Sequence, residues 1–172
     1  MTHILTDNSV VIVKDNHRVE LSKRDFNKEM LASPILNELS IKELIEIWKD
    51  VYGIPSNLLD FLKRKIELYS SSANINSFIY EGKEYWLDKS NRNSLWNLSN
   101  STVGDVEFIV GDDVVIMNAL KLKAFILKLE VYAYKSFVNT FKHQKAVKAL
   151  TALEDIINYD YTTGYPEKIT LE

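Results

Sequence analysis

The side chains that could do chemistry in this chain are few and scattered. The adjacent carboxylates of Asp112 and Asp113 could act as an acid–base pair or hold a cation, but they follow Gly111 between two strand-like segments. Aspartate is favoured in such turns because its side chain accepts hydrogen bonds from the nearby backbone. We therefore interpret Asp112 and Asp113 as turn residues.

Metal ligands and nucleophiles are equally sparse. The chain has no cysteine, and its three histidines, His3, His17 and His143, show no H-x-x-x-H spacing, so a zinc site is not expected. The five glycines form neither a G-x-x-x-x-G-K nor a G-x-G-x-x-G loop, and no serine lies in a G-x-S-x-G motif. The sequence therefore predicts a protein that is not an enzyme and uses no metal, nucleotide or other cofactor.

Aromatic side chains offer one further kind of site, a platform that stacks on sugar rings or bases. Trp and Tyr are also enriched in cores and protein interfaces, and we favour that interpretation. A glycan-active enzyme therefore stays the least favoured function class. The aromatic residues concerned are Tyr85, Trp86, Trp96, Tyr159, Tyr161 and Tyr165.

The composition limits the class of protein and its partners. The 172 residues, 46% hydrophobic and 26% charged, fit a globular chain of one domain or two small ones. A net charge of −3 gives no basic surface for nucleic acid or an anionic membrane. We see neither an apolar run that could span a membrane nor the basic segment of a signal peptide at the start. Nucleic-acid and membrane partners are therefore not expected.

The elements that would position any site predict an α+β fold. Residues 10–13 and 18–21 alternate like a β-hairpin, and two capping boxes, Ser22 with Asp25 and Ser40 with Glu43, predict helix starts. The helix after Ser40 should run to Val51 and stop at Gly53 and Pro55. A second helix from Ser56 to Tyr69 would complete an αα-hairpin.

Residues 70–77 are small and polar and predict a linker, which divides the chain into a mostly helical module, 1–76, and an α+β domain, 77–172. Asp88 and Asn118 are expected to cap the two main helices of the second domain, and Thr151 with Glu154 a last short one. The expected order is hairpin 78–87, helix 89–98, hairpin 106–117, helix 119–147, a helix from 151 and an extended tail 160–172.

The long helix 119–147 contains no Gly or Pro and carries two apolar faces. The first predicts an ordinary core contact and comprises Leu122, Phe125, Ile126, Leu129, Tyr132, Ala133 and Phe137. The second comprises Leu120, Leu127, Val131, Tyr134, Val138 and Phe141, beside lysines at 121, 128, 135 and 142. The second face would leave a large exposed apolar patch unless something covers it.

Two interpretations of the second face remain open. Either residues 41–69 of the same chain pack on it, or another protein chain does, as at an oligomer seam. We expect partner contacts there and from the aromatic tail, which is long enough to pair as a strand or wedge against a neighbour. The expected partner-binding residues are Leu127, Val131, Tyr134, Val138, Phe141, Tyr161, Tyr165, Pro166 and Ile169.

Residues 78–172 read as F-I-Y-E-G-K-E-Y-W-L-D-K-x-x-R, then V-E-F-I-V-G-D-D-V-V-I-M, a long helix, and I-I-N-Y-D-Y-T-T-G-Y-P-E-K-I-T. This order resembles a domain family of unknown function from tailed bacteriophages and prophages that occurs beside tail-fibre genes. Asp88 and Arg92 match its helix-opening pair, and the Tyr- and Gly-containing ending is similar to versions from phages of gut Bacteroidetes. Residues 1–77 match no pattern that we can assign.

The resemblance implies a small virion structural protein, associated with fibre, tail or head, with other phage structural proteins as partners in a homo-oligomer or a hetero-assembly. The implied location is the virion, and the host cytoplasm during assembly. A fibre assembly factor that is not part of the virion is the alternative. The family implies no catalytic residue.

Overall fold

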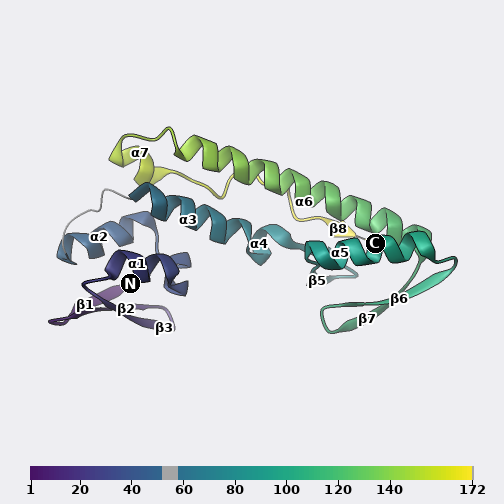
Figure 1. The fold of residues 1–172 in the computed structure, drawn as a ribbon, viewed down its shortest axis with the longest axis horizontal. Helices are drawn as coiled ribbons and strands as arrows, with labels where there is room; N and C mark the ends of the chain where they lie inside the picture. The colour runs from purple at the N-terminus through teal and green to yellow at the C-terminus, as the bar shows by residue number, and fades with distance from the viewer. Residues whose placement is uncertain (52–57, 172) are drawn as a thin grey trace. The chain divides into compact units, whose positions relative to one another are not determined.

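The computed structural model describes residues 1–51 and 58–171 and has the α+β fold that the sequence predicts (Figure 1). The chain divides into two compact units, and each combines segments that are distant in sequence. Unit 1 comprises residues 1–69 and 143–161, and unit 2 comprises residues 70–142 and 162–172.

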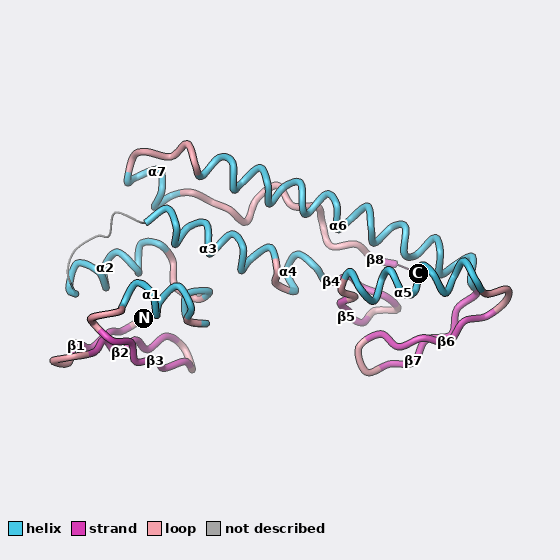
Figure 2. The backbone as a smooth tube through the Cα atoms, viewed as in Figure 1, coloured by secondary structure: helices cyan, strands magenta, loops and turns pink. Residues whose placement is uncertain are grey.

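Unit 1 contains a three-stranded sheet and several helices. Figure 2 shows strands in magenta and helices in cyan. The strands are antiparallel in the order β1-β2-β3, with Val10 opposite Leu21. The elements are β1 (Thr2–Leu5), β2 (Ser9–Lys14), β3 (His17–Ser22), α1 (Phe26–Ala32), the 3₁₀ helix η1 (Pro34–Asn37), α2 (Ile41–Val51), α3 (Leu58–Ser70) and α7 (Leu153–Asn158).

The core of unit 1 forms around Trp48 of α2, which is fully buried. Its ring meets Phe61 of α3 edge to face at 4.6 Å between centroids, and its indole N–H donates to Asn27 Oδ1 at 2.8 Å. Val147 and Ile156, from the end of the long helix and from α7, complete the same core.

Of the two capping boxes predicted for the first helices of unit 1, one forms in the structure and the other does not. Ser40 and Glu43 exchange side-chain-to-backbone hydrogen bonds at 2.7 and 3.1 Å, which confirms the capping box of α2. The box at Ser22 is wrong: α1 begins at Phe26, and Ser22 is the last residue of β3. Its N–H donates instead to Glu29.

The expected stop at Gly53 and Pro55 and the helix start at Ser56 lie outside the described residues. The box at Thr151 is wrong as well, since Ala152 precedes α7 and no side chain caps it. Strand β1 was not predicted; it pairs with β2 along its whole length.

Unit 2 packs two β-hairpins and a helix against one long helix. Its elements are α4 (Ala73–Asn76), β4 (Ser77–Tyr80), β5 (Lys83–Trp86), α5 (Lys89–Ser101), β6 (Asp105–Val110), β7 (Asp113–Asn118), α6 (Ala119–Val147, shared with unit 1) and β8 (Thr170–Leu171). Both hairpins confirm the prediction. The expected linker 70–77 is instead structured, with α4 and the first residue of β4 inside it.

Aromatic contacts join the first hairpin of unit 2 to the long helix. Phe78 and Tyr80 of β4 both meet Phe125 of α6 edge to face, each at 5.5 Å between centroids. Leu171 of β8 pairs with Tyr80 in parallel and is buried in the same core. The tail thus supplies the third strand of this sheet, in the order β5-β4-β8.

The two units differ from the expected division into 1–76 and 77–172. The first boundary falls at Tyr69–Ser70, near the expected one, but residues 143–161 return to unit 1. They do so because Val147 and Ile156 bury their side chains among the residues of the N-terminal core.

Candidate protein-binding face

The candidate site lies on α6, which begins where the sequence predicts. Asn118 caps it, since its Oδ1 accepts from the backbone N–H of Leu120 at 3.0 Å, and the Ala119 N–H donates to the Gly104 carbonyl at 2.8 Å. No Gly or Pro interrupts the following 29 residues. A helix of this length can present different side chains to different surroundings along each side.

The buried side of α6 follows a regular alternation of four- and three-residue steps. Its N-terminal half is apolar, as predicted, but its C-terminal half continues with Ser136, Thr140 and His143, all buried. The residues on these steps are Leu122, Ile126, Leu129, Ala133, Ser136, Thr140, His143 and Val147.

Tyrosine hydroxyls form hydrogen bonds with Thr140 and His143, two of the polar residues on the buried side of α6. In unit 2, Tyr165 lies 3.0 Å from Thr140 Oγ1. In unit 1, the Tyr159 hydroxyl lies 2.8 Å from His143 Nδ1. The apolar pattern alone missed these positions, whereas the continued 4–3 spacing from Leu122 identifies them.

Phe137 does not lie on the buried side as expected, and its side chain is 66% exposed. Ser136 takes the buried position instead, because the 4–3 repeat from Ala133 continues through 136 and 140. Phe137 therefore borders the second face of α6.

The second face of α6 is exposed within unit 2. The exposed fractions of Leu120, Leu127, Val131, Tyr134 and Phe141 range from 50% to 78%, and Val138 is partly buried. With Ala124, which is also exposed, they repeat in the same 4–3 steps, and we call the set the α6 outer face. It comprises Leu120, Ala124, Leu127, Val131, Tyr134, Val138 and Phe141.

Different side chains border the α6 outer face along its two edges. Along one edge stand Lys121, Lys128, Lys135 and Lys142, which are exposed. Along the other edge, the unit uses its own charges: Glu130 pairs with Arg92 at 2.6 Å, and Lys123 donates to Asn100 and lies over the Trp96 ring. These four lysines make no ion pair with the residues that the structure describes, so positive charge gathers at the first edge, which we call the lysine edge.

The tail packs closely beside α6 at Gly164. Gly164 has φ +74°, and a Cβ there would lie 2.8 Å from Asn139 Oδ1. The Asn139 amide donates to the Thr163 carbonyl at 2.8 Å. This close approach fixes the tail against α6 before it turns toward β8.

Further contacts of the tail also lie within the chain. Lys168 forms an ion pair with Glu84, whose pKa is lowered by the hydrogen bonds from Lys168 and Ser77. The Ile79 N–H donates to the Ile169 carbonyl at 2.9 Å, and the Ile169 side chain packs on the unit 2 core.

The four predicted tail contacts thus have places within the chain itself. Tyr165 and Ile169 pack within unit 2, whereas Tyr161 meets the Tyr69 ring in unit 1 at 5.7 Å between centroids. Pro166 is partly buried and lines a groove on the surface of unit 2. A contact of these residues with another chain stays a prediction.

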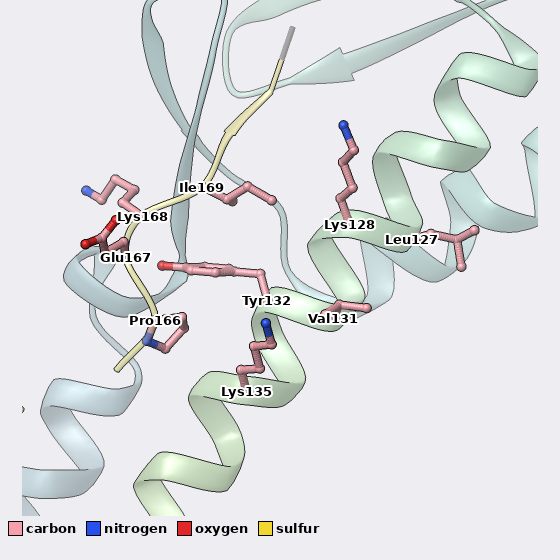
Figure 3. Close-up of a pocket in the computed structure, with 9 residues that line it drawn as sticks. All are labelled: Leu127, Lys128, Val131, Tyr132, Lys135, Pro166, Glu167, Lys168 and Ile169. Atoms are coloured by element: carbon pink, nitrogen blue, oxygen red, sulfur yellow. The ribbon is translucent and has the colours of Figure 1, made fainter. Parts of the chain in front are cut away.

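Between the tail and the lysine edge runs a groove of about 680 Å³ (Figure 3). Tyr132 points from α6 toward the tail, and Lys128 and Lys135 stand before and after it along the helix (Figure 3). A second hollow continues the groove past Pro166 toward Lys142. Apolar walls and amines therefore lie together along this side of the outer face.

The structure places Asp113 in a structural role. Its carboxylate accepts from the Tyr85 hydroxyl at 2.7 Å and from Lys83 at 3.1 Å, which joins the two hairpins of unit 2. The hydrogen bond to Asp113 raises the pKa of Tyr85 to about 12, and the same bond lowers the pKa of Asp113. Asp112 lies in the turn, as predicted, while Asp113 begins β7.

The other candidate chemical groups are dispersed in the structure. Across residues 1–51 and 58–171, no three acidic, histidine or cysteine side chains cluster as metal ligands would. Within the same ranges, none of the helices has the length and apolar character that a membrane span requires. His3 pairs with Asp50 at 2.7 Å and His17 with Glu38 at 2.5 Å, so the three histidines lie in separate contacts.

Comparison with known proteins gives no relative for this chain: no protein-family model, curated protein or solved structure matches it.

Proposed function

We propose that this chain is a structural or assembly protein that acts through protein–protein contacts, with α6 as its binding element. The observation that carries the proposal is the α6 outer face. Seven side chains repeat along it in coiled-coil spacing, and the large apolar ones among them are mostly exposed. A contiguous apolar stripe of this kind typically marks a protein interaction site.

Within this function, we propose a small component of a bacteriophage particle that joins or decorates fibre, tail or head. The support is the resemblance of residues 78–172 to the phage domain family. The capped α5 fits this pattern, since Asp88 accepts from the Asn91 N–H at 2.7 Å and Arg92 reaches the Leu87 carbonyl and Glu130. These contacts give the two motif residues structural roles.

An assembly factor outside the virion is the alternative, and the same apolar face favours it equally. A factor that holds a fibre subunit during trimerisation also needs an exposed seam. The two functions differ in whether the chain remains in the finished particle.

Mass spectrometry of purified particles tests the proposal. A virion component is expected at fixed stoichiometry with the other structural proteins. An assembly factor is expected to be absent from particles but to co-purify with a fibre subunit from infected cells. Absence from both samples would contradict the phage function. Val131→Asp is the matched variant, because a charge in the middle of the apolar face should abolish either association.

A further inference from the structure

The α6 outer face has the positions of a coiled-coil seam. In heptad notation, Ala124, Val131 and Val138 occupy a positions, and Leu120, Leu127, Tyr134 and Phe141 occupy d positions. Each lysine of the lysine edge then occupies an e position, so all four amines flank the same side of the seam. Flanking e and g side chains select the partner of a coiled coil by charge.

A second copy of this chain suits that seam poorly. In an antiparallel pair of α6 helices, e positions face e positions, so the four lysines of one copy would lie against those of the other. In a parallel pair, Lys128 would face Lys123 of the second copy, and Lys135 would face Glu130, which already pairs with Arg92 at 2.6 Å. Neither arrangement gives the four lysines a set of carboxylates that is not already engaged within the chain.

The groove adds positive charge to apolar surface on the same side. It is lined by Leu127, Val131, Pro166 and Ile169 together with Lys128 and Lys135. Of the two other charged residues that line it, Lys168 pairs with Glu84, and Glu167 is the one carboxylate. Leu127 and Val131 belong both to the groove and to the seam. A partner that lies on the outer face would thus also meet the amines of the groove wall.

We propose that the α6 outer face binds an amphipathic helix of another protein whose flanking positions carry Asp or Glu toward the lysine edge. The inference rests on the proposed function, whose partner it specifies. Acidic side chains at the facing positions would pair with Lys121, Lys128, Lys135 and Lys142, which make no ion pair in the described structure. The apolar side chains at the a and d positions of the partner helix would cover the α6 outer face.

Two designed helices of about 28 residues test the charge complementarity. Both carry Leu at a and d positions, and one has Glu and the other Lys at all e and g positions. Fluorescence anisotropy with the full chain at low salt should give an affinity for the acidic helix about tenfold higher than for the basic one. The preference should shrink at high salt, because exposed ion pairs are screened.

Charge reversal supplies the matched control. The variant K121E/K128E/K135E/K142E should prefer the basic helix, while its far-UV circular dichroism and Tm stay close to those of the wild type, because these side chains are exposed. Val131→Asp should weaken binding of both designed helices by at least about tenfold. A reversed preference with an unchanged fold would place the recognition at the lysine edge.

Four outcomes would overturn the inference. They are no binding of either helix, equal affinity for both, self-association by sedimentation that Val131→Asp abolishes, and binding to phosphatidylserine vesicles in place of the acidic helix. The proposed function can fail separately. If the acidic helix does not bind but Val131→Asp still removes the chain from particles or from a fibre subunit, the function stands and this partner chemistry is wrong.

Discussion

Helices α2 and α6 differ in the side chains that they carry on the side facing away from the core. In α2, the buried side carries Leu44, Ile47 and Trp48, and the opposite side carries Lys42, Glu46 and Lys49, which are exposed. In α6, the side opposite the core is apolar over several turns. An exposed apolar side is therefore not a feature that α2 shares with α6, and its presence on α6 supports the proposed binding surface.

A substitution in the core of α2 should destabilise the chain far more than one on the α6 outer face. Trp48→Ala should lower the free energy of unfolding by about 3–5 kcal/mol, because it leaves a cavity against Phe61. Tyr134→Ala should change it by less than about 0.5 kcal/mol, because the Tyr134 side chain is exposed. Urea unfolding at low protein concentration measures both. A loss for Tyr134→Ala as large as for Trp48→Ala would mean that the chain covers the face itself.

Lys65 is a charged side chain inside unit 1, in contrast to the exposed lysines beside the α6 outer face. The residue is almost fully buried, and its amine donates to the Leu36 carbonyl at 2.7 Å and to the Leu39 carbonyl. Burial, together with the nearby charge of Lys14 and against that of Glu43, lowers the pKa of Lys65 to about 8.

The unfolded chain should therefore bind the Lys65 proton more tightly than the folded chain. The free energy of unfolding should rise between pH 8 and about 10.5 relative to Lys65→Met, by up to about 3 kcal/mol. Urea titrations of both proteins from pH 7 to 10.5 measure the difference. A difference independent of pH would show that the Lys65 pKa is not lowered.

Gly164 provides a smaller test on the side of α6 that carries the tail. Gly164→Ala should cost about 2 kcal/mol, because the residue has positive φ and its Cβ would meet Asn139. Gly82→Ala is the matched control: φ is +78° there, but nothing lies within 4 Å of the added Cβ, so about 1 kcal/mol is expected. Thermal unfolding compares the two variants, and equal losses would mean that the Asn139 contact contributes nothing.

A chelator should change the thermal stability of the chain very little. With no cysteine and three dispersed histidines, EDTA should shift Tm by less than about 1 °C, since no bound cation would be removed from the native state. Differential scanning calorimetry with and without EDTA measures the shift. A drop of several degrees would indicate an oxygen-ligand cation site, and Asp105, Asp112 and Asp113 would be the first residues to substitute.

The sequence predicts best what depends on neighbouring residues. The capping pairs at Ser40 and Asp88, the two hairpins of unit 2 and the full length of α6 all follow from local hydrogen bonding and periodicity. Local chemistry alone misleads at Ser22 and Thr151, where a serine or threonine three residues before an acid caps no helix. At Ser22, the strand pairing with Ser9 takes the residue into β3.

Features set by distant segments could not be predicted from local patterns. Strand β1 forms because residues 10–13 pair with it, and the buried polar residues Thr140 and His143 are satisfied by tyrosines that follow 25 and 16 residues later. For the candidate site, the sequence identified the apolar stripe and its lysines. The sequence placed Phe137 on the buried side of α6, because position 137 lies where the two apolar faces border each other.

The return of residues 143–161 to unit 1 has a consequence for the order of folding during synthesis. Val147 and Ile156 leave the ribosome only after all of residues 70–142, although they belong to the core built around Trp48. Unit 1 therefore waits for its last core residues while most of unit 2 is already available to fold. Contacts of such large sequence separation slow folding. The core of the nascent N-terminal segment stays incomplete until late in translation. Chaperone protection of its apolar surface matters most during that interval.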